Sequence, residues 1–137
     1  MTQMNGVYQG QLRSMSTHLA SGNSLLTDAP TDNHGKGEAF SPTDLLCTAL
    51  GSCMMTLMGI VATREGLALE GTRWDITKIM ADAPRRVAAV KIDFFFPEGL
   101  ALSEAQKQKL ENAARNCPVA LSLSGDLQQE VAFHFAV

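Results

Sequence analysis

The sequence is poor in charge and lacks the short motifs of several common protein classes. Only 18% of its residues are Asp, Glu, Lys or Arg, below the usual share of about a quarter in soluble domains. Its net charge is −3 and it has no block of basic residues, so the composition argues against nucleic-acid binding. CxxC, HExxH and GxGxxG are all absent, which removes the usual support for zinc-binding, metalloprotease and dinucleotide-binding functions.

The sequence also lacks the features of a secreted protein. It has three cysteines, and an odd number is not typical of a secreted disulfide scaffold. Residues 1–11 show neither the basic start nor the apolar run of a signal peptide. We therefore expect a cytoplasmic protein in a reducing environment.

Residues 45–63 carry no charge and are about as long as a membrane span. The run includes small and polar residues, and neither a basic cluster nor an aromatic belt flanks it. We therefore expect no membrane span but the central helix of a domain or dimer, apolar on nearly all its faces. With 137 residues, 45% of them apolar, the chain is expected to form one domain over residues 1–137.

Turn residues, caps and apolar periodicity predict an α+β fold with the order ββ-α-ββ-α-α-β. The start of the long helix is the strongest local signal, because Ser41 can cap, Pro42 suits the first position and Asp44 suits the first turn. Gly66 is a good stop for a helix that runs to about residue 65. The other predicted elements are strands 7–12 and 19–27 with a turn at 21–23, a loop at 28–40, strands 70–81 and 86–96, a helix capped by Ser103 and Gln106 that ends within 112–116, a helix from 118 to about 123, and a strand at 128–137.

Two cysteines occupy predicted helices and are the main candidates for chemistry. Cys53 lies in the middle of the long helix, where it is either a small buried hydrophobe or a reactive thiol that needs a nearby cation. Cys117 precedes Pro118 at the start of the short helix. There it is either a small apolar cap or a thiol whose anionic form the helix amides stabilise.

Two segments resemble the motifs of the OsmC/Ohr family, the osmotically induced and organic-hydroperoxide-resistance proteins. The first combines Ser-Pro-Thr-Asp-Leu-Leu at 41–46 with Ala-Leu-Gly-Ser-Cys at 49–53, and the second is Asn-Cys-Pro-Val-Ala at 116–120. The predicted order of elements is also similar, so the resemblance covers nearly the whole chain. It implies an OsmC-like fold in an intertwined homodimer, with paired central helices and two active sites at the interface.

The resemblance also implies a thiol-dependent peroxidase. Cys53 would attack an organic hydroperoxide, and Cys117 would resolve the sulfenic acid as a disulfide. A dithiol reductant, lipoyl or thioredoxin-type, would close the cycle, and we expect no cofactor and no metal. The arginine that activates the thiolate in this family is best matched by Arg13.

One position departs from the pattern of the peroxidases. Where a glutamate normally follows the proline and pairs with the arginine, this sequence has Thr43. Asp44 is one residue late, and Glu38 in the preceding loop is a candidate replacement. His18 is a further candidate for lining the site. The alternative function is therefore a non-catalytic OsmC-like protein that binds a small apolar ligand at the dimer interface.

Overall fold

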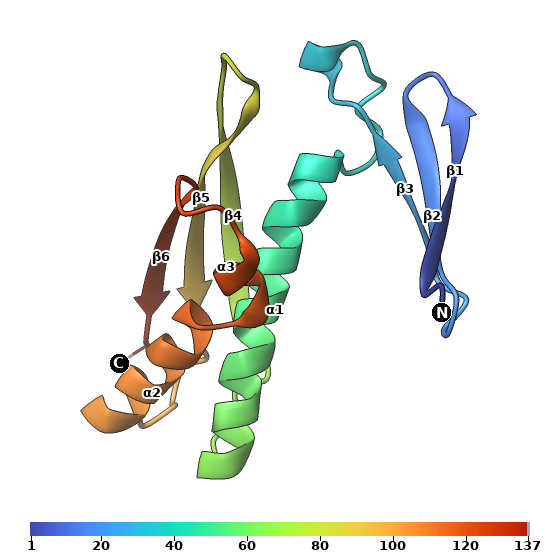
Figure 1. Cartoon of the computed structure of the whole chain (residues 1–137). Helices are drawn as coiled ribbons and strands as arrows, with labels where there is room; N and C mark the ends of the chain where they lie inside the picture. The colour runs from blue at the N-terminus through green and yellow to red at the C-terminus, as the bar shows by residue number, and fades with distance from the viewer. Residues whose placement is uncertain (137) are drawn as a thin grey trace. The chain divides into compact units, whose positions relative to one another are not determined.

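The computed structural model describes residues 1–136, in which it places two three-stranded sheets and three α-helices (Figure 1). The elements are β1 (Met4–Gly10), β2 (Arg13–His18), β3 (Ser24–Asp28), the 3-10 helix η1 (Thr31–Asn33), α1 (Pro42–Glu65), β4 (Arg73–Ala81), β5 (Arg86–Phe95), α2 (Glu104–Arg115), α3 (Pro118–Ser122) and β6 (Gln128–His134). The described residues form two compact units, Met1–Leu46 and the chain from Cys47 onward. This is the predicted α+β class with one additional strand.

The first unit contains the antiparallel sheet β1-β2-β3. The turn predicted at 21–23 is confirmed, and Gly22 adopts a left-handed φ of 77° there. The strand predicted over 7–12 is wrong at its end, because Gln11 and Leu12 have left-handed φ angles of 54° and 63° and turn the chain. The strand predicted over 19–27 is also wrong in its first half, because the turn at Gly22 precedes β3, which begins only at Ser24. Neither Gln11 nor Leu12 is a residue type that favours a left-handed turn. The turn was therefore not predicted, and strand β2 after it was not predicted either.

Helix α1 has the predicted bounds. The Ser41 hydroxyl accepts a hydrogen bond from the Asp44 N–H at 3.0 Å, and the Asp44 carboxylate accepts one from the Ser41 N–H at 2.9 Å. This reciprocal pair satisfies two amides at the helix start, and Gly66 ends the helix with a φ of 69°. By length and composition alone, α1 could cross a membrane, but the core helix of a soluble protein passes the same test. Six of its residues are buried in the protein: Cys47, Leu50, Gly51, Met54, Met58 and Ala62.

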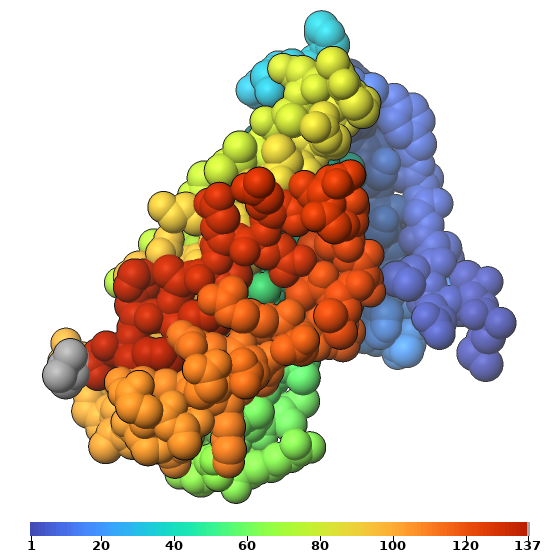
Figure 2. All heavy atoms as spheres, turned by 60° about the vertical axis from the view of Figure 1, so that its left-hand side comes forward, coloured from blue at the N-terminus to red at the C-terminus, as the bar shows by residue number. Residues whose placement is uncertain are grey.

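The second unit has the sheet order β4-β5-β6, with β5 antiparallel to β4 and parallel to β6. Alternate residues of β5 fill the core, and Val90, Ile92 and Phe94 are completely buried. Figure 1 shows the three helices on one face of this sheet. In Figure 2 the orange and red atoms of α2, α3 and β6 cover much of the green helix α1 from this side.

The remaining predicted elements agree with the structure apart from their ends. The strand predicted from residue 70 begins at Arg73, because Gly71 turns the chain with a φ of 93°. The capping box of α2 is confirmed, with Ser103 and Gln106 bonded reciprocally. The last strand ends at His134, and its predicted final residue, Val137, lies outside the described residues.

Gly51 determines how closely α1 approaches β4. A Cβ atom at this position would lie 2.9 Å from both Ile76 Cδ1 and Trp74 Nε1. These contacts are too short for any side chain, so the helix and the strand need glycine here to pack as they do.

We predict that Gly51→Leu destabilises the protein. Overpacking a close contact of this kind costs about 1–3 kcal/mol, although leucine is the better helix former. Urea denaturation followed by circular dichroism measures the change. An unfolding free energy equal to or above that of the unmodified protein would contradict the assigned packing.

Candidate functional site

The second unit brings Cys53 and Cys117 together. Cys53 lies midway along α1 and is partly exposed, whereas Cys117 is completely buried as the N-terminal cap of α3. The Ala120 N–H donates to Cys117 Sγ at 3.4 Å. The Cys53 side chain is close enough to exchange a hydrogen bond with the Cys117 thiol. Two thiols from distant parts of the sequence therefore share one site.

Burial raises the pKa of the Cys117 thiol. The amides of Ala120 and Val119 act in the opposite direction, as the start of a helix should, and the neighbouring Cys53 raises the pKa further. The predicted stabilisation of a Cys117 thiolate by helix amides is therefore present, but burial outweighs it. Cys117 remains a protonated thiol beside Cys53.

The third cysteine has different surroundings. Cys47 lies six positions before Cys53 on α1 and is only 2% exposed. No disulfide joins the three cysteines, all of which the structure describes. Among them Cys53 alone is accessible to solvent, so a dissolved oxidant would meet it first.

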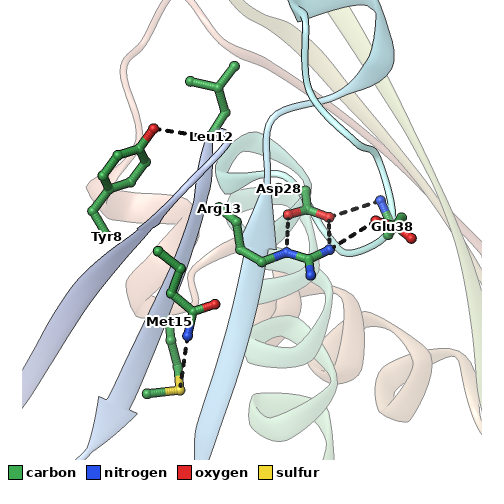
Figure 3. A network of polar contacts seen from close by, with 7 residues as sticks. Tyr8, Leu12, Arg13, Met15, Asp28 and Glu38 are labelled. Carbon is green, nitrogen blue, oxygen red and sulfur yellow. Dashed lines mark hydrogen bonds and ion pairs between the residues drawn. The ribbon is translucent and has the colours of Figure 1, made fainter.

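The first unit holds Arg13 in a network of carboxylates (Figure 3). Arg13 Nε donates to Asp28 Oδ1 at 2.6 Å, and Arg13 Nη2 donates to Asp28 Oδ2 at 2.7 Å. The second nitrogen also contacts Glu38 Oε1 at 3.3 Å. Asp28 is 1% exposed, and the Glu38 N–H donates to its Oδ2 at 3.0 Å. The two-point contact fixes the plane of the guanidinium.

The Arg13 contact lowers the pKa of the Asp28 carboxyl, an effect larger than the opposing effect of burial. The Glu38 amide and the charge of Lys36 lower it further. Asp28 in turn raises the pKa of Arg13. The pair is therefore ionised throughout the physiological pH range.

Sequence reasoning missed Asp28. It ends β3 directly opposite Arg13 in β2, and opposed residues of neighbouring strands bring their side chains together. This pairing follows from the register of β2 and β3. The sequence did not predict β2, because it gave no signal for the turn at residues 11 and 12. The acidic residue that ends a strand just before a long loop is the signal that points to it.

The other candidate residues are distributed over the first unit. Glu38 contacts Arg13. The Thr43 hydroxyl lies 3.1 Å from the Ser41 hydroxyl, within the start of α1. His18 Nδ1 lies 2.6 Å from Ser21 Oγ in the turn after β2. Since Arg13 and His18 are the two ends of β2, they are about 17 Å apart at 3.3–3.4 Å per residue, and the structure does not bring them together.

Residues 1–136 contain no group of three or more His, Cys, Asp or Glu side chains arranged to hold a metal ion.

Comparison with known proteins identifies relatives over the whole chain. The model of a family described as OsmC-like protein matches residues 35–131. A solved structure from Psychrobacter arcticus 273-4, named for osmotic stress induction and a detoxification response, is 47% identical with a TM-score of 0.93. The match covers 98% of this chain and 96% of that one. A search of curated proteins gave no match.

Two more distant solved structures share the fold. An organic hydroperoxide resistance protein OsmC from Legionella pneumophila is 15% identical, with a TM-score of 0.69 and 98% of each chain covered. A Vibrio cholerae protein named for organic hydroperoxide resistance, with captopril bound in one of its active sites, is 18% identical. Its TM-score is 0.72, and the match covers 97% of this chain and 92% of that one. At these identities the likeness supports the fold alone, and it confirms the expected OsmC-like α+β architecture.

We predict that Asp28→Asn destabilises the protein at neutral pH and that this penalty shrinks in acid. A carboxyl whose folded pKa lies below its unfolded value stabilises the fold above the unfolded pKa, which is about 3.9. The stabilisation is lost as pH falls from there through the folded pKa. Urea denaturation between neutral pH and pH 3 measures the difference between the two proteins.

The exposed loop carboxylate Asp126 provides a matched control. Asp126→Asn should change stability little at any pH, as surface substitutions usually do. If the penalty of Asp28→Asn were the same in acid as at neutral pH, Asp28 would not owe its stabilising effect to the ion pair with Arg13.

Proposed function

The chain belongs to the OsmC-like protein family, and we propose that it is a thiol-dependent peroxidase that reduces organic hydroperoxides through a Cys53/Cys117 disulfide cycle. The main observation in support is the contact of a partly exposed thiol, Cys53, with a buried one, Cys117. Structural relatives named for organic hydroperoxide resistance agree with this chemistry.

The first step is oxidation of Cys53. Its thiolate attacks the terminal oxygen of the hydroperoxide, so that an S–O bond forms and the O–O bond breaks. The alkoxide leaves and takes up a proton to become an alcohol. Cys53 is then a sulfenic acid, oxidised by two electrons, and the hydroperoxide has been reduced by two.

The second step is resolution by Cys117. Its sulfur attacks the sulfenic sulfur of Cys53, an S–S bond forms, and the S–O bond breaks. The proton of the Cys117 thiol leaves with the hydroxide as water. An external dithiol, lipoyl or thioredoxin-type, then exchanges with the disulfide and restores both thiols while it becomes a disulfide itself.

In this proposal the charge of Arg13 favours the thiolate form of Cys53. The family's usual glutamate partner for the arginine is replaced here by Thr43. This departure favours the alternative function, a non-catalytic protein that binds a small apolar ligand. Arg13 nevertheless has two carboxylate partners, Asp28 and Glu38. The substitution at Thr43 therefore does not remove the support for the arginine, and the peroxidase remains the better supported function.

We also propose that the protein acts as a homodimer, with two features in support. Sheet β1-β2-β3 exposes several large apolar side chains, namely Met4, Val7, Tyr8, Leu25 and Leu26. Small residues of α1, including Ser52, Thr56 and Gly59, line an open groove of about 360 Å³ together with Trp74. Surfaces of this kind are typical of interfaces with another chain, and the occupant proposed here is a second copy.

We predict that one equivalent of an alkyl hydroperoxide converts Cys53 and Cys117 into an intramolecular disulfide and leaves Cys47 reduced. The bond requires Cα atoms within about 7 Å in the oxidised form. Cys117→Ser should stop at a Cys53 sulfenic acid that dimedone traps, and Cys53→Ser should not react. Peptide mass mapping distinguishes these products.

Cys47→Ser is the matched control, since it removes a thiol from the same helix and should leave the disulfide unchanged. A bridge to Cys47 would contradict the proposed cycle, as would a Cys53 thiol that survives hydroperoxide treatment. The second result would favour the protein that binds an apolar ligand without catalysis.

We predict that Gly59→Leu weakens the dimer. A Cβ atom at Gly59 meets nothing within 4 Å inside the subunit, so the new side chain enters only the space proposed for the second copy. Sedimentation velocity at micromolar concentration should show a dimer for the unmodified protein and dissociation for the variant. Gln108→Leu, on the exposed face of α2, is the control. A folded monomer of the unmodified protein would rule out the proposed dimer.

A further inference from the structure

We infer that Gln129 is a positioning residue for the second step of the proposed cycle, because its side-chain amide holds the short helix that Cys117 caps. The inference rests on the resolving role of Cys117 in the proposed function, and it adds a residue of strand β6 to that role. Gln129, Cys117 and Cys53 all lie in the second unit.

Helix α3 is too short to keep its own position. It has five residues, Pro118–Ser122, whereas isolated helices of fewer than about 12 residues are marginal in water. The last four carbonyls of a helix have no N–H partner within it, and the chain becomes extended at Leu123, with a φ of −82° and a ψ of 155°. The place of α3 therefore depends on contacts with other elements.

Gln129 makes such a contact from β6. Its Nε2 donates to the Ala120 carbonyl at 3.0 Å in a partly buried hydrogen bond, and this carbonyl is among the last four of α3. The β5–β6 register pairs Gln129 with Val90, which is completely buried. Paired residues of neighbouring strands point to the same face of a sheet. Gln129 therefore faces the helices and joins the sheet to α3 three residues after Cys117.

Ala120, the residue that Gln129 holds, also contacts the reacting sulfur. Its N–H donates to Cys117 Sγ at 3.4 Å. Burial raises the pKa of the Cys117 thiol, and the amides of Ala120 and Val119 act in the opposite direction. When this sulfur attacks the sulfenic acid of Cys53, the S–S bond forms, the S–O bond breaks, and the thiol proton leaves with the hydroxide as water. The Ala120 amide then faces a sulfur that is losing its proton, so the position of α3 affects the rate of this step.

A second contact between this region and β6 is less suited to the task. Arg115 is the last residue of α2, and its Nη2 donates to the Val131 carbonyl at 3.4 Å on the exposed surface. This long hydrogen bond competes with water and belongs to the helix before Cys117. It does not hold the Ala120 amide, whereas the contact of Gln129 is shorter, partly buried and made to Ala120 itself.

The test follows the two cysteines in turn with an aromatic disulfide, dithiobis(nitrobenzoate), in place of the hydroperoxide. The Cys53 thiolate attacks the reagent, so that a mixed disulfide forms and one nitrothiobenzoate anion leaves. The Cys117 sulfur then attacks the Cys53 sulfur, its proton passes to solvent, and the second anion leaves behind a Cys53–Cys117 disulfide. Absorbance records the two releases as separate phases, and peptide mass mapping identifies the disulfide.

Gln129→Met keeps the length of the side chain and removes the N–H donor. It should slow the second phase about tenfold, because the buried Ala120 carbonyl loses its donor, and it should leave the first phase unchanged. The pH profile of the second phase should also move to higher pH, since the Ala120 amide no longer lies fixed beside the Cys117 sulfur. Gln128→Met is the matched control: it makes the same change at the exposed neighbour in β6 and should alter neither phase.

A second variant keeps the test decisive if Gln129→Met folds poorly. Gln129→Glu keeps the size and polarity of the side chain, but at neutral pH its carboxylate has no donor for the Ala120 carbonyl. It should therefore slow the second phase at least as much. A folded variant with the unmodified second phase would overturn the inference. Equal slowing of both phases would also overturn it, because it would indicate a general loss of structure.

The same proteins, assayed for consumption of an alkyl hydroperoxide, distinguish the two proposals. If the unmodified protein consumes no hydroperoxide while Gln129→Met slows the second phase alone, the peroxidase function fails and the positioning role stands. If the protein consumes hydroperoxide and the second phases of Gln129→Met and the unmodified protein coincide, the positioning role fails alone. If the unmodified protein shows no second phase, Cys117 does not resolve Cys53, and both proposals are wrong.

Discussion

The close approach of α1 to β4 at Gly51 is the packing constraint on which the cysteine site depends. Without a side chain at Gly51, the long uncharged helix lies against Trp74 and Ile76, and its neighbouring residues Leu50, Met54 and Met58 fill the core. Cys53 is two positions further along the same helix and remains partly exposed. The core thus places the Cys53 sulfur at the border between the buried interior and solvent, where a dissolved molecule can reach it.

The two thiols have different environments because they lie on different sides of that border. Cys117 caps a short helix inside the protein, and burial keeps it protonated. A thiol that holds its proton until its neighbour has been oxidised suits a resolving role, since it does not compete for the hydroperoxide. In the proposed chemistry the site therefore differentiates two identical side chains by their exposure to solvent.

Local chemistry in the sequence predicted the parts of the fold that depend on neighbours along the chain. Ser41, Pro42 and Gly66 set the bounds of α1, and Cys117 before Pro118 marked the start of α3. The pairing of Arg13 with Asp28 was not predictable in the same way, because it depends on the register of β2 and β3. The turn at Gln11 and Leu12, which defines β2, has none of the usual turn residues. Likewise the protonation of Cys117 depends on burial by distant segments, which outweighs the local effect of the helix amides.

The measurement that tests the central claim most directly is the steady-state consumption of an alkyl hydroperoxide with a small dithiol as reductant. The account predicts that the protein consumes many equivalents per chain and oxidises the dithiol in equal amount, and that Cys53→Ser reduces this rate to that of the dithiol alone. Consumption by the unmodified protein no faster than by the dithiol alone would contradict it, and so would an undiminished rate in Cys53→Ser.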